Sequence, residues 1–106
     1  MGHFLGTNEH MILLAVVRLG EGAYGASILD ELRHATGRAP SSGSLSTTLD
    51  RLEAKGLVES RYVDGDAGRG GHPRRVVGLT APGRAELRAT EAAFRGLRTD
   101  LRPEGG

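Results

Sequence analysis

The chain contains a short segment, residues 41–61, whose hydroxyl and charged side chains could hydrogen-bond to an extended partner. Its sequence is SSGSLSTTLDRLEAKGLVESR. Leu45, Leu49 and Leu52 recur at helical spacing, and at about 100° per residue they lie on one side of a helix. The other side carries small, polar and charged residues: Gly43, Thr47, Asp50, Arg51 and Ala54. A thin helix face of this kind can enter a major groove and meet phosphates or base edges.

The two ends of this segment carry signals that start and stop a helix. Serine and glycine open it, where a side-chain oxygen can accept a hydrogen bond from a free backbone amide. Gly56 can end it, because glycine adopts the left-handed conformation that a Cβ opposes. We therefore expect a recognition helix over residues 42–55. Its expected DNA contacts are Ser42, Ser44, Thr47 and Arg51. Any small helix packed on a core would show the same three leucines, so a purely structural helix is the alternative.

A second set of residues that could bind an anion lies in residues 64–75, with the sequence DGDAGRGGHPRR. Its glycines disfavour helix and strand, and the Asp-Gly pair at its start is typical of a turn. Apolar residues typical of strands flank it: Leu57, Val58, Tyr62 and Val63 on one side, and Val76, Val77 and Leu79 on the other. The pattern predicts a hairpin, or wing, whose flexible tip carries Arg69, Arg74 and Arg75 to the minor groove or to phosphates. A solvated loop whose charges serve solubility is the alternative.

Two further helices are expected before residue 41, and they would position the recognition helix. The first spans about residues 8–19, with Thr7 as its N-cap and Gly20 as its stop. The second has apolar residues at helical spacing and ends near Gly37. Three helices followed by a hairpin predict a mainly α fold with a small β-hairpin, namely a winged helix-turn-helix.

A last helix is expected after Thr80, which can cap it, with Pro82 in its first turn, where a missing amide is tolerated. Its apolar residues recur with heptad-like spacing, and Thr90 forms a polar gap in the stripe. A narrow apolar stripe on a terminal helix favours pairing with a second copy of the chain. The expected dimerisation residues are Met11, Leu87, Phe94, Leu97 and Leu101.

The same seam could enclose a small apolar effector. The residues of such a pocket would be Met11, Val16, Phe94 and Leu97, and the alternative is a dry dimer core. The chain is thus divided into a DNA-binding domain over residues 1–79, a dimerisation helix over residues 80–102 and a disordered tail over residues 103–106.

The composition limits the other functions that the chain could have. Only 4% of its 106 residues are aromatic, so the core must consist of Leu, Val, Ile and Ala. There is no cysteine and the four histidines form no ligand motif, so no metal and no cofactor are expected. An enzyme is not expected, since no pair of acid and base has a nucleophile or a pocket nearby. Neither a signal peptide nor a membrane span is apparent, which predicts a cytoplasmic protein.

Four blocks of sequence, taken in order, resemble the PadR family of bacterial winged-helix transcriptional regulators, in its short form with one C-terminal helix. The blocks are LLAVVRLG, YGASILDEL, GSLSTTLDRLEAKGLVESR and LTAPGRAEL. The resemblance spans about residues 4–97. Tyr24 matches the family's tyrosine at the start of the second helix, which implies a DNA contact. Ser46 stands where the family commonly has an aromatic residue, and it could still hydrogen-bond a phosphate. Val76 and Val77 stand where the family commonly has an aromatic pair.

The resemblance implies a dimeric repressor of a palindromic operator in double-stranded DNA, which many members release when a phenolic, antibiotic or other ligand binds. A two-fold dimer would read two half-sites about one DNA turn apart. The net charge of +1 leaves a second interpretation open, a winged-helix module that binds protein instead of DNA. Near absence of binding to any duplex at low salt would favour that interpretation.

Overall fold

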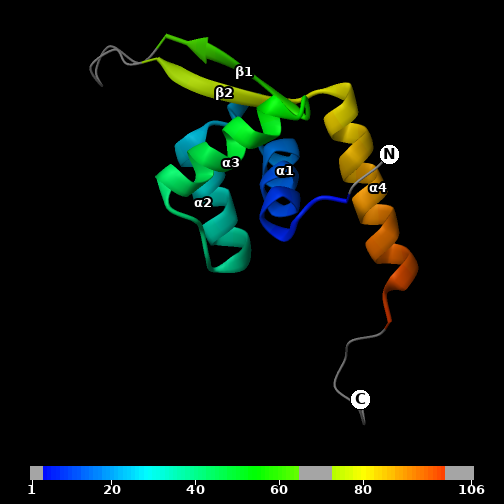
Figure 1. The fold of residues 1–106 in the computed structure, drawn as a ribbon. Coiled ribbons are helices and arrows are strands. Elements are labelled where there is room, and N and C mark those ends of the chain that lie inside the picture. The colour runs from blue at the N-terminus through cyan, green and yellow to red at the C-terminus, as the bar shows by residue number, and fades with distance from the viewer. Residues whose placement is uncertain (1–3, 65–72, 100–106) are drawn as a thin grey trace.

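The computed structural model describes residues 4–64 and 73–99 (Figure 1). Three helices come first, followed by an antiparallel hairpin and a fourth helix. The elements are α1 (Thr7–Leu19), the 3₁₀ turn η1 (Gly20–Gly22), α2 (Gly25–Thr36), α3 (Ser42–Ala54), β1 (Val58–Val63), β2 (Arg74–Leu79) and α4 (Ala81–Leu97). This architecture confirms the predicted fold class, a mainly α winged helix-turn-helix with a two-stranded wing and an additional C-terminal helix.

An aliphatic core holds α1, α2, α3 and the hairpin together. Its fully buried side chains include Ile12, Leu13, Ile28, Leu45, Leu52, Val58 and Val77. None of the aromatic side chains in the described residues belongs to this core, as the composition predicted. Burying one leucine or isoleucine stabilises a fold by about 1.5–3 kcal/mol, so this cluster fixes α3 firmly against the other elements.

The limits of α3 and α4 follow the capping signals of the sequence. At the start of α3, Ser41 Oγ accepts a hydrogen bond from Ser44 N at 3.1 Å. Gly56, just beyond the helix, has a φ of +78°, which an L side chain rarely adopts. At the start of α4, Thr80 Oγ1 accepts from Gly83 N at 3.0 Å. Local hydrogen bonding therefore determines where both helices begin.

The start of α1 differs from the expectation. Thr7, the predicted cap, is the first helical residue, and the cap position belongs to Gly6. The Gly6 N–H donates to one carboxylate oxygen of Glu9 at 3.3 Å, and Lys55 Nζ donates to the other at 2.9 Å. Glu9 thus satisfies a free amide at the start of α1 and also ties α1 to the end of α3.

The hairpin is longer than its apolar residues suggested. The strands pair antiparallel, with Val58 opposite Leu79, and the pairing continues up to the wing tip. Arg74 and Arg75 therefore lie in β2, and their predicted place on the wing tip is wrong. Backbone pairing extends past the last apolar residue because the ladder is made by main-chain groups. The tip itself, with Arg69, lies outside the described residues.

The other edge of β2 is joined to the segment that leads into α2. Val77 N donates to Ala23 O at 2.9 Å, and Tyr24 forms an antiparallel bridge with Val76. Val76 and Val77 are both buried there. Backbone hydrogen bonds therefore join strand β2 of the wing to the segment that leads into α2.

α4 runs alongside the body of the molecule (Figure 1). Leu87 is 8% exposed and belongs to the core, and Thr90 Oγ1 accepts a hydrogen bond from Leu5 N at 3.1 Å. This corrects the expectation that both residues lie along an exposed seam, since both face the chain's own body. Phe94 and Leu97, in contrast, are 52% and 84% exposed.

The sequence also predicted features of the C-terminal part of the chain. Leu101 and the expected tail lie outside the described residues, and the division of the chain at residue 79 stays a prediction. In the described parts of the chain, no helix combines the length and the apolar character needed to cross a bilayer.

Candidate nucleic-acid interface

The outward side of α3 is an exposed polar stripe, opposite the buried Leu45, Leu49 and Leu52 of the same helix. Every residue that the sequence analysis selected on this helix is exposed: Ser42, Ser44, Ser46, Thr47 and Arg51. Arg51 forms no ion pair with the residues that the structure describes, so its guanidinium can meet an anion. The stripe therefore offers hydroxyl, carboxylate and guanidinium groups on a rigid helix.

A groove of about 390 Å³ runs beside α3, between the start of α2 and the base of β2. Tyr24, Ser42, Ser46 and Arg74 are among the residues that line it. The Arg74 guanidinium lies over the Tyr24 ring, with 4.4 Å between its central carbon and the ring centroid. Because the ring face attracts a cation, Tyr24 holds this guanidinium beside the helix. The structure thus gathers residues that the sequence placed on three separate elements.

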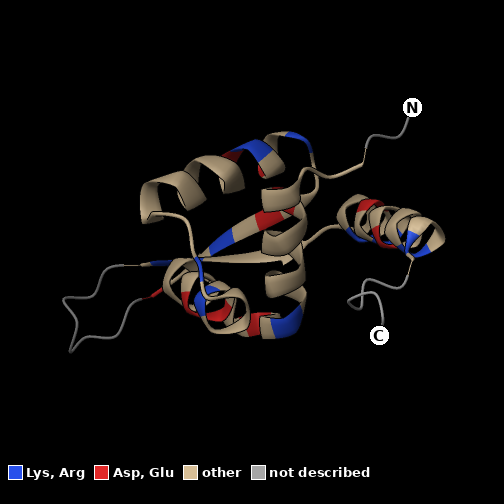
Figure 2. Ribbon diagram, turned by 90° about the horizontal axis from the view of Figure 1, so that it is seen from below, with Lys and Arg blue, Asp and Glu red and all other residues tan. Residues whose placement is uncertain are grey.

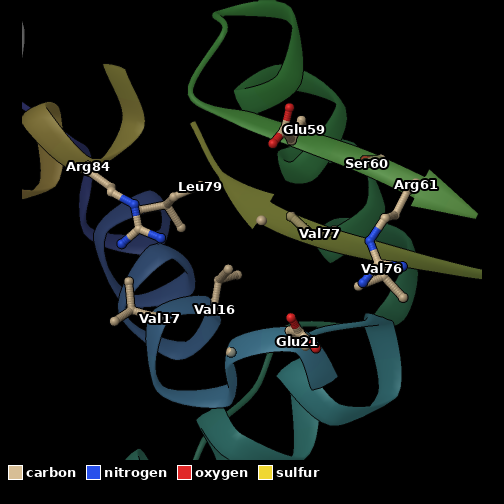
Figure 3. Close-up of a pocket in the computed structure, with 12 residues that line it drawn as sticks. Val16, Val17, Glu21, Glu59, Ser60, Arg61, Val76, Val77, Leu79 and Arg84 are labelled. Atoms are coloured by element: carbon tan, nitrogen blue, oxygen red, sulfur yellow. The ribbon is translucent and has the colours of Figure 1, made fainter. Parts of the chain in front are cut away.

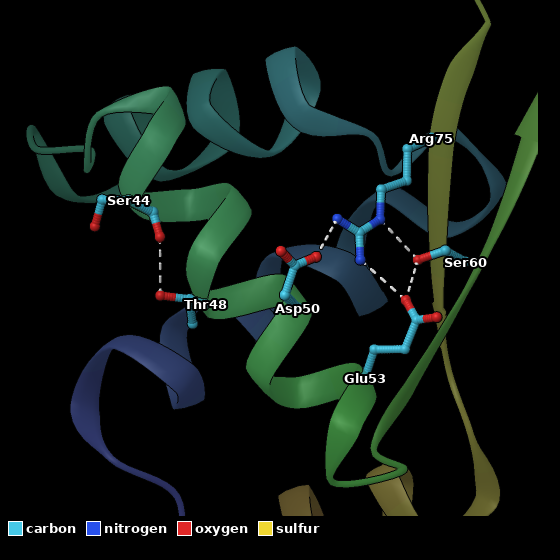
Figure 4. A network of polar contacts seen from close by, with 6 residues as sticks. All are labelled: Ser44, Thr48, Asp50, Glu53, Ser60 and Arg75. Atoms are coloured by element: carbon cyan, nitrogen blue, oxygen red, sulfur yellow. Dashed lines mark hydrogen bonds and ion pairs between the residues drawn. The ribbon is translucent and has the colours of Figure 1, made fainter.

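Arg75 is held by three neighbouring side chains (Figure 4). Its Nη1 donates to Asp50 Oδ1 at 2.8 Å, its Nη2 to Glu53 Oε1 at 2.9 Å and its Nε to Ser60 Oγ at 2.9 Å. Ser60 Oγ in turn donates to the same Glu53 oxygen at 2.6 Å. This network connects α3 with both strands and so fixes the angle between the helix and the wing.

The charges in this network stabilise one another. Partial burial alone would lower the pKa of Arg75, but the hydrogen bonds to Glu53 and Asp50 raise that pKa above its ordinary value. Hydrogen bonds from Ser60 and Arg75 lower the pKa of the Glu53 carboxyl. With its side chain 22% exposed, Arg75 is a structural cation and not the freely accessible one that the sequence suggested.

Sequence reasoning missed this network, although a usable signal existed. Asp50 and Glu53 are three residues apart and therefore neighbours on one side of α3. The strand β2, which begins with two arginines, lies close to this side of α3 in the fold. Two acids on a helix beside a basic strand indicate an ion-pair network, but only once the packing of the two elements is known.

Along the described helices, Lys and Arg segments are interspersed with Asp and Glu segments (Figure 2). This agrees with the net charge of +1. Attraction for a polyanion must therefore come from local groups, such as the exposed Arg51 and the half-buried Arg74.

The four expected effector residues do not share one cavity of the subunit as described. Val16 lines a cavity of about 570 Å³ between α1, the sheet and the start of α4 (Figure 3). Met11 lines a separate cavity of about 320 Å³ between α1 and α2. Phe94 and Leu97 line neither of them.

The Phe94 ring instead stacks on the His10 ring of α1, with 5.4 Å between the centroids and 14° between the planes. His10 Nε2 also forms a hydrogen bond with the Glu91 carboxylate. These two contacts hold the middle of α4 against α1. Within the described ranges, no group of three or more His, Cys, Asp or Glu side chains is placed to hold a metal.

Comparisons with known proteins agree with this geometry. Residues 13–89 match the model of the transcriptional regulator PadR-like family. A PadR-like transcription factor from Bacteroides fragilis is 28% identical with a TM-score of 0.72, covering 87% of this chain and 84% of that one. A PadR family regulator from Eggerthella lenta is 28% identical with a TM-score of 0.68, covering 85% and 76%. Bacillus subtilis PadR, solved in complex with operator DNA, is 20% identical with a TM-score of 0.67, covering 93% and 52%. A comparison with curated proteins gave no match.

Proposed function

Because the chain belongs to the PadR-like family of transcriptional regulators, we propose that it controls transcription by binding double-stranded DNA through α3 and the wing. The observation that carries this proposal is the exposed polar face of α3, flanked by the Arg74 guanidinium on the Tyr24 ring. Bacillus subtilis PadR, which has the same fold, was solved in complex with operator DNA, and this supports the proposal.

The interface residues take different roles according to their chemistry. Thr47 and Arg51, on the outermost side of α3, meet base edges in the major groove. The serines at the start of the helix lie near phosphates, where their hydroxyl groups donate to phosphate oxygens. These serines are Ser42, Ser44 and Ser46. Tyr24 and Arg74 contact the backbone beside the helix, and Arg69 does so from the wing tip. Arg75 acts indirectly, because its partners on α3 keep the wing in register with the helix.

A homodimer places two copies of α3 on one palindromic operator. The exposed apolar side chains of the terminal helix, Phe94 and Leu97, support this assembly, together with Leu14 and Val17 on α1. Burying such side chains against a second copy removes apolar surface from water. The dimer acts as a repressor that occupies its operator. A small apolar effector bound between the subunits, near Met11 and Phe94, would release it.

The experiment that tests the function is selection of random duplexes by the purified protein, followed by sequencing of the bound fragments. We expect an enriched palindrome with half-sites about one helical turn apart. A library that stays unenriched at low salt would overturn the proposal. We expect neither an enzymatic activity nor a cofactor, and the cytoplasmic location stays a prediction from the sequence.

The near-neutral charge favours a second candidate, a winged-helix module that binds another protein. In that case, the exposed stripe of α3 would be a protein contact. Failure to bind any duplex, combined with an intact fold, would support this candidate.

A further inference from the structure

An acidic side chain lies in the middle of the face that the proposed function turns toward DNA. Asp50 is on the same side of α3 as Thr47, one turn away, and its side chain is 68% exposed. A free carboxylate at this position would be repelled by phosphates. Its presence on the outermost stripe therefore requires either a structural or a reading role.

The structure holds the Asp50 carboxylate in one orientation. Arg75 Nη1 donates to Oδ1 at 2.8 Å, and Arg75 is itself fixed by Glu53 and Ser60. The guanidinium offsets part of the negative charge, which reduces repulsion from the DNA backbone. Oδ2 forms no hydrogen bond with the described residues, and Figure 4 shows it pointing away from Arg75. One oxygen is thus anchored, and the other is a free acceptor on the exposed face.

We propose that Asp50 is a specificity-determining residue that selects cytosine by accepting a hydrogen bond from its N4 amino group, an inference that rests on the proposed DNA binding. In the major groove, guanine presents only acceptors and thymine an acceptor and a methyl group, so neither satisfies a carboxylate. Adenine presents an N6 donor, but its N7 acceptor lies beside it and repels a second acceptor. Cytosine presents its N4 donor with no acceptor of the same base beside it, so a carboxylate can accept that hydrogen bond without repulsion from a neighbouring acceptor.

Arg75 is the positioning residue for this contact. Because it ties Asp50 to β1 and β2, the carboxylate reaches the groove already oriented, and little side-chain freedom is lost when it binds. The ion pair with Arg75 also argues against Asp50 acting only to repel DNA, because a carboxylate with that role would need no cation to offset its charge.

The test compares the duplex motifs selected by the wild-type protein, Asp50→Ala and Asp50→Asn, each checked for an unchanged thermal unfolding curve. We expect one cytosine in each wild-type half-site, favoured at least about fivefold over the other bases. Asp50→Ala should lose this preference while the rest of the motif persists. Asp50→Asn should move the preference toward adenine, because an amide pairs with adenine N6 and N7.

Glu59→Gln is the control, because Glu59 is an exposed acid on β1 that forms no ion pair with the described residues and takes no part in holding Arg75. It should keep the cytosine preference, and an equal loss of that preference in Glu59→Gln would show that the preference does not depend on Asp50 and would overturn the inference. An Asp50→Ala motif identical to the wild-type motif would also overturn it, while leaving the DNA-binding function standing. A wild-type protein that selects no motif at all would overturn the function and the inference together.

Discussion

Gly83 of α4 lies directly against the backbone of Leu57, so close that a Cβ on Gly83 would be 1.9 Å from the Leu57 carbonyl oxygen. The neighbouring Thr80 N–H donates to that same oxygen at 3.1 Å. The start of α4 is thereby pressed against the segment that links α3 to β1. Contact of this kind is open only to glycine, because the opposing atoms are main-chain atoms that have no rotamer to change.

We predict that Gly83→Ala lowers the free energy of unfolding by about 2 kcal/mol or more, since α4 must move away from the core to relieve the overlap. Gly96→Ala is the matched control in the same helix, because a Cβ there meets no atom of the described residues within 4 Å. It should leave the protein equally stable or stabilise it by a few tenths of a kcal/mol. Urea unfolding of both variants measures the difference, and equal midpoints would contradict the predicted overlap.

A second prediction concerns acid stability and the Glu9–Lys55 pair. Partial burial acts to raise the pKa of Glu9, but hydrogen bonds from Lys55 and Gly6 outweigh it, so the native pKa lies below 4.5. A lowered native pKa means that the carboxylate stabilises the fold above the unfolded-state value and that this contribution disappears as the pH falls through the native pKa. Glu9→Gln should therefore lose about 0.5–1 kcal/mol of stability at pH 7.

The difference between Glu9→Gln and wild type should shrink steadily below pH 4.5. Glu21→Gln is the control, because Glu21 is exposed and forms no ion pair in the described part of the chain. Unfolding curves recorded across the acid range give the comparison. A Glu9→Gln deficit that is the same at pH 7 and in strong acid would argue against the ion pair as its source.

Much of the fold was predictable because its signals are local. Leucine spacing, the caps Ser41 and Thr80 and the left-handed Gly56 depend on residues within one or two turns of each other. The order of three helices, a hairpin and a last helix followed from these signals alone. Errors arose where a long-range contact decided the outcome. Thr90 was expected at an exposed seam, but Leu5, far away in the sequence, donates to its hydroxyl in the interior.

The site was only partly predictable for the same reason. The exposed side of α3 follows from helical periodicity, so Thr47 and Arg51 were identified correctly as surface residues. The neighbours of Arg74 and Arg75 depend on how the hairpin packs against α2 and α3. No local pattern places Arg74 on Tyr24 or joins Arg75 to Asp50 and Glu53.

The pairing of Arg74 with Tyr24 predicts that their effects on DNA affinity are coupled. Arg74→Ala should weaken binding to specific and non-specific duplexes alike and reduce the salt slope by about 1, because one phosphate contact is lost. Tyr24→Leu should act in the same direction, since the guanidinium loses its support. The double variant should bind about as well as Arg74→Ala alone.

Titrations of labelled duplexes at several salt concentrations measure these effects. Arg88→Ala removes an equal charge from an exposed site on α4 and serves as the control, with a smaller change in slope. Strictly additive losses for Tyr24 and Arg74 would show that the two residues act independently.

Arg51 is expected to read a base and not merely to attract phosphates. Arg51→Ala should weaken binding to the selected operator by about 1–3 kcal/mol. Arg51→Lys should lose nearly as much on the operator, because lysine lacks the fork that pairs with guanine, yet it should keep non-specific affinity. Gel-shift titrations at physiological salt compare the variants. Full operator affinity in Arg51→Lys would reduce Arg51 to a phosphate contact, and full affinity in Arg51→Ala would remove it from the interface.

The exposed end of α4 provides the last prediction, on assembly. Leu97 is 84% exposed and Phe94 is 52% exposed, whereas the helix before them is anchored by Leu87 and Thr90. If a second copy covers this end, Leu97→Glu places a charge in the interface and should convert the dimer to a monomer without unfolding the subunit. Operator affinity should then fall steeply, because each half-site is bound separately and the effective concentration of the second subunit is lost. Arg95→Glu changes the charge of an exposed neighbour on α4 and should leave the dimer intact. Sedimentation of the two variants at equal concentration decides the matter, since a Leu97→Glu protein that still sediments as a dimer would place the interface elsewhere.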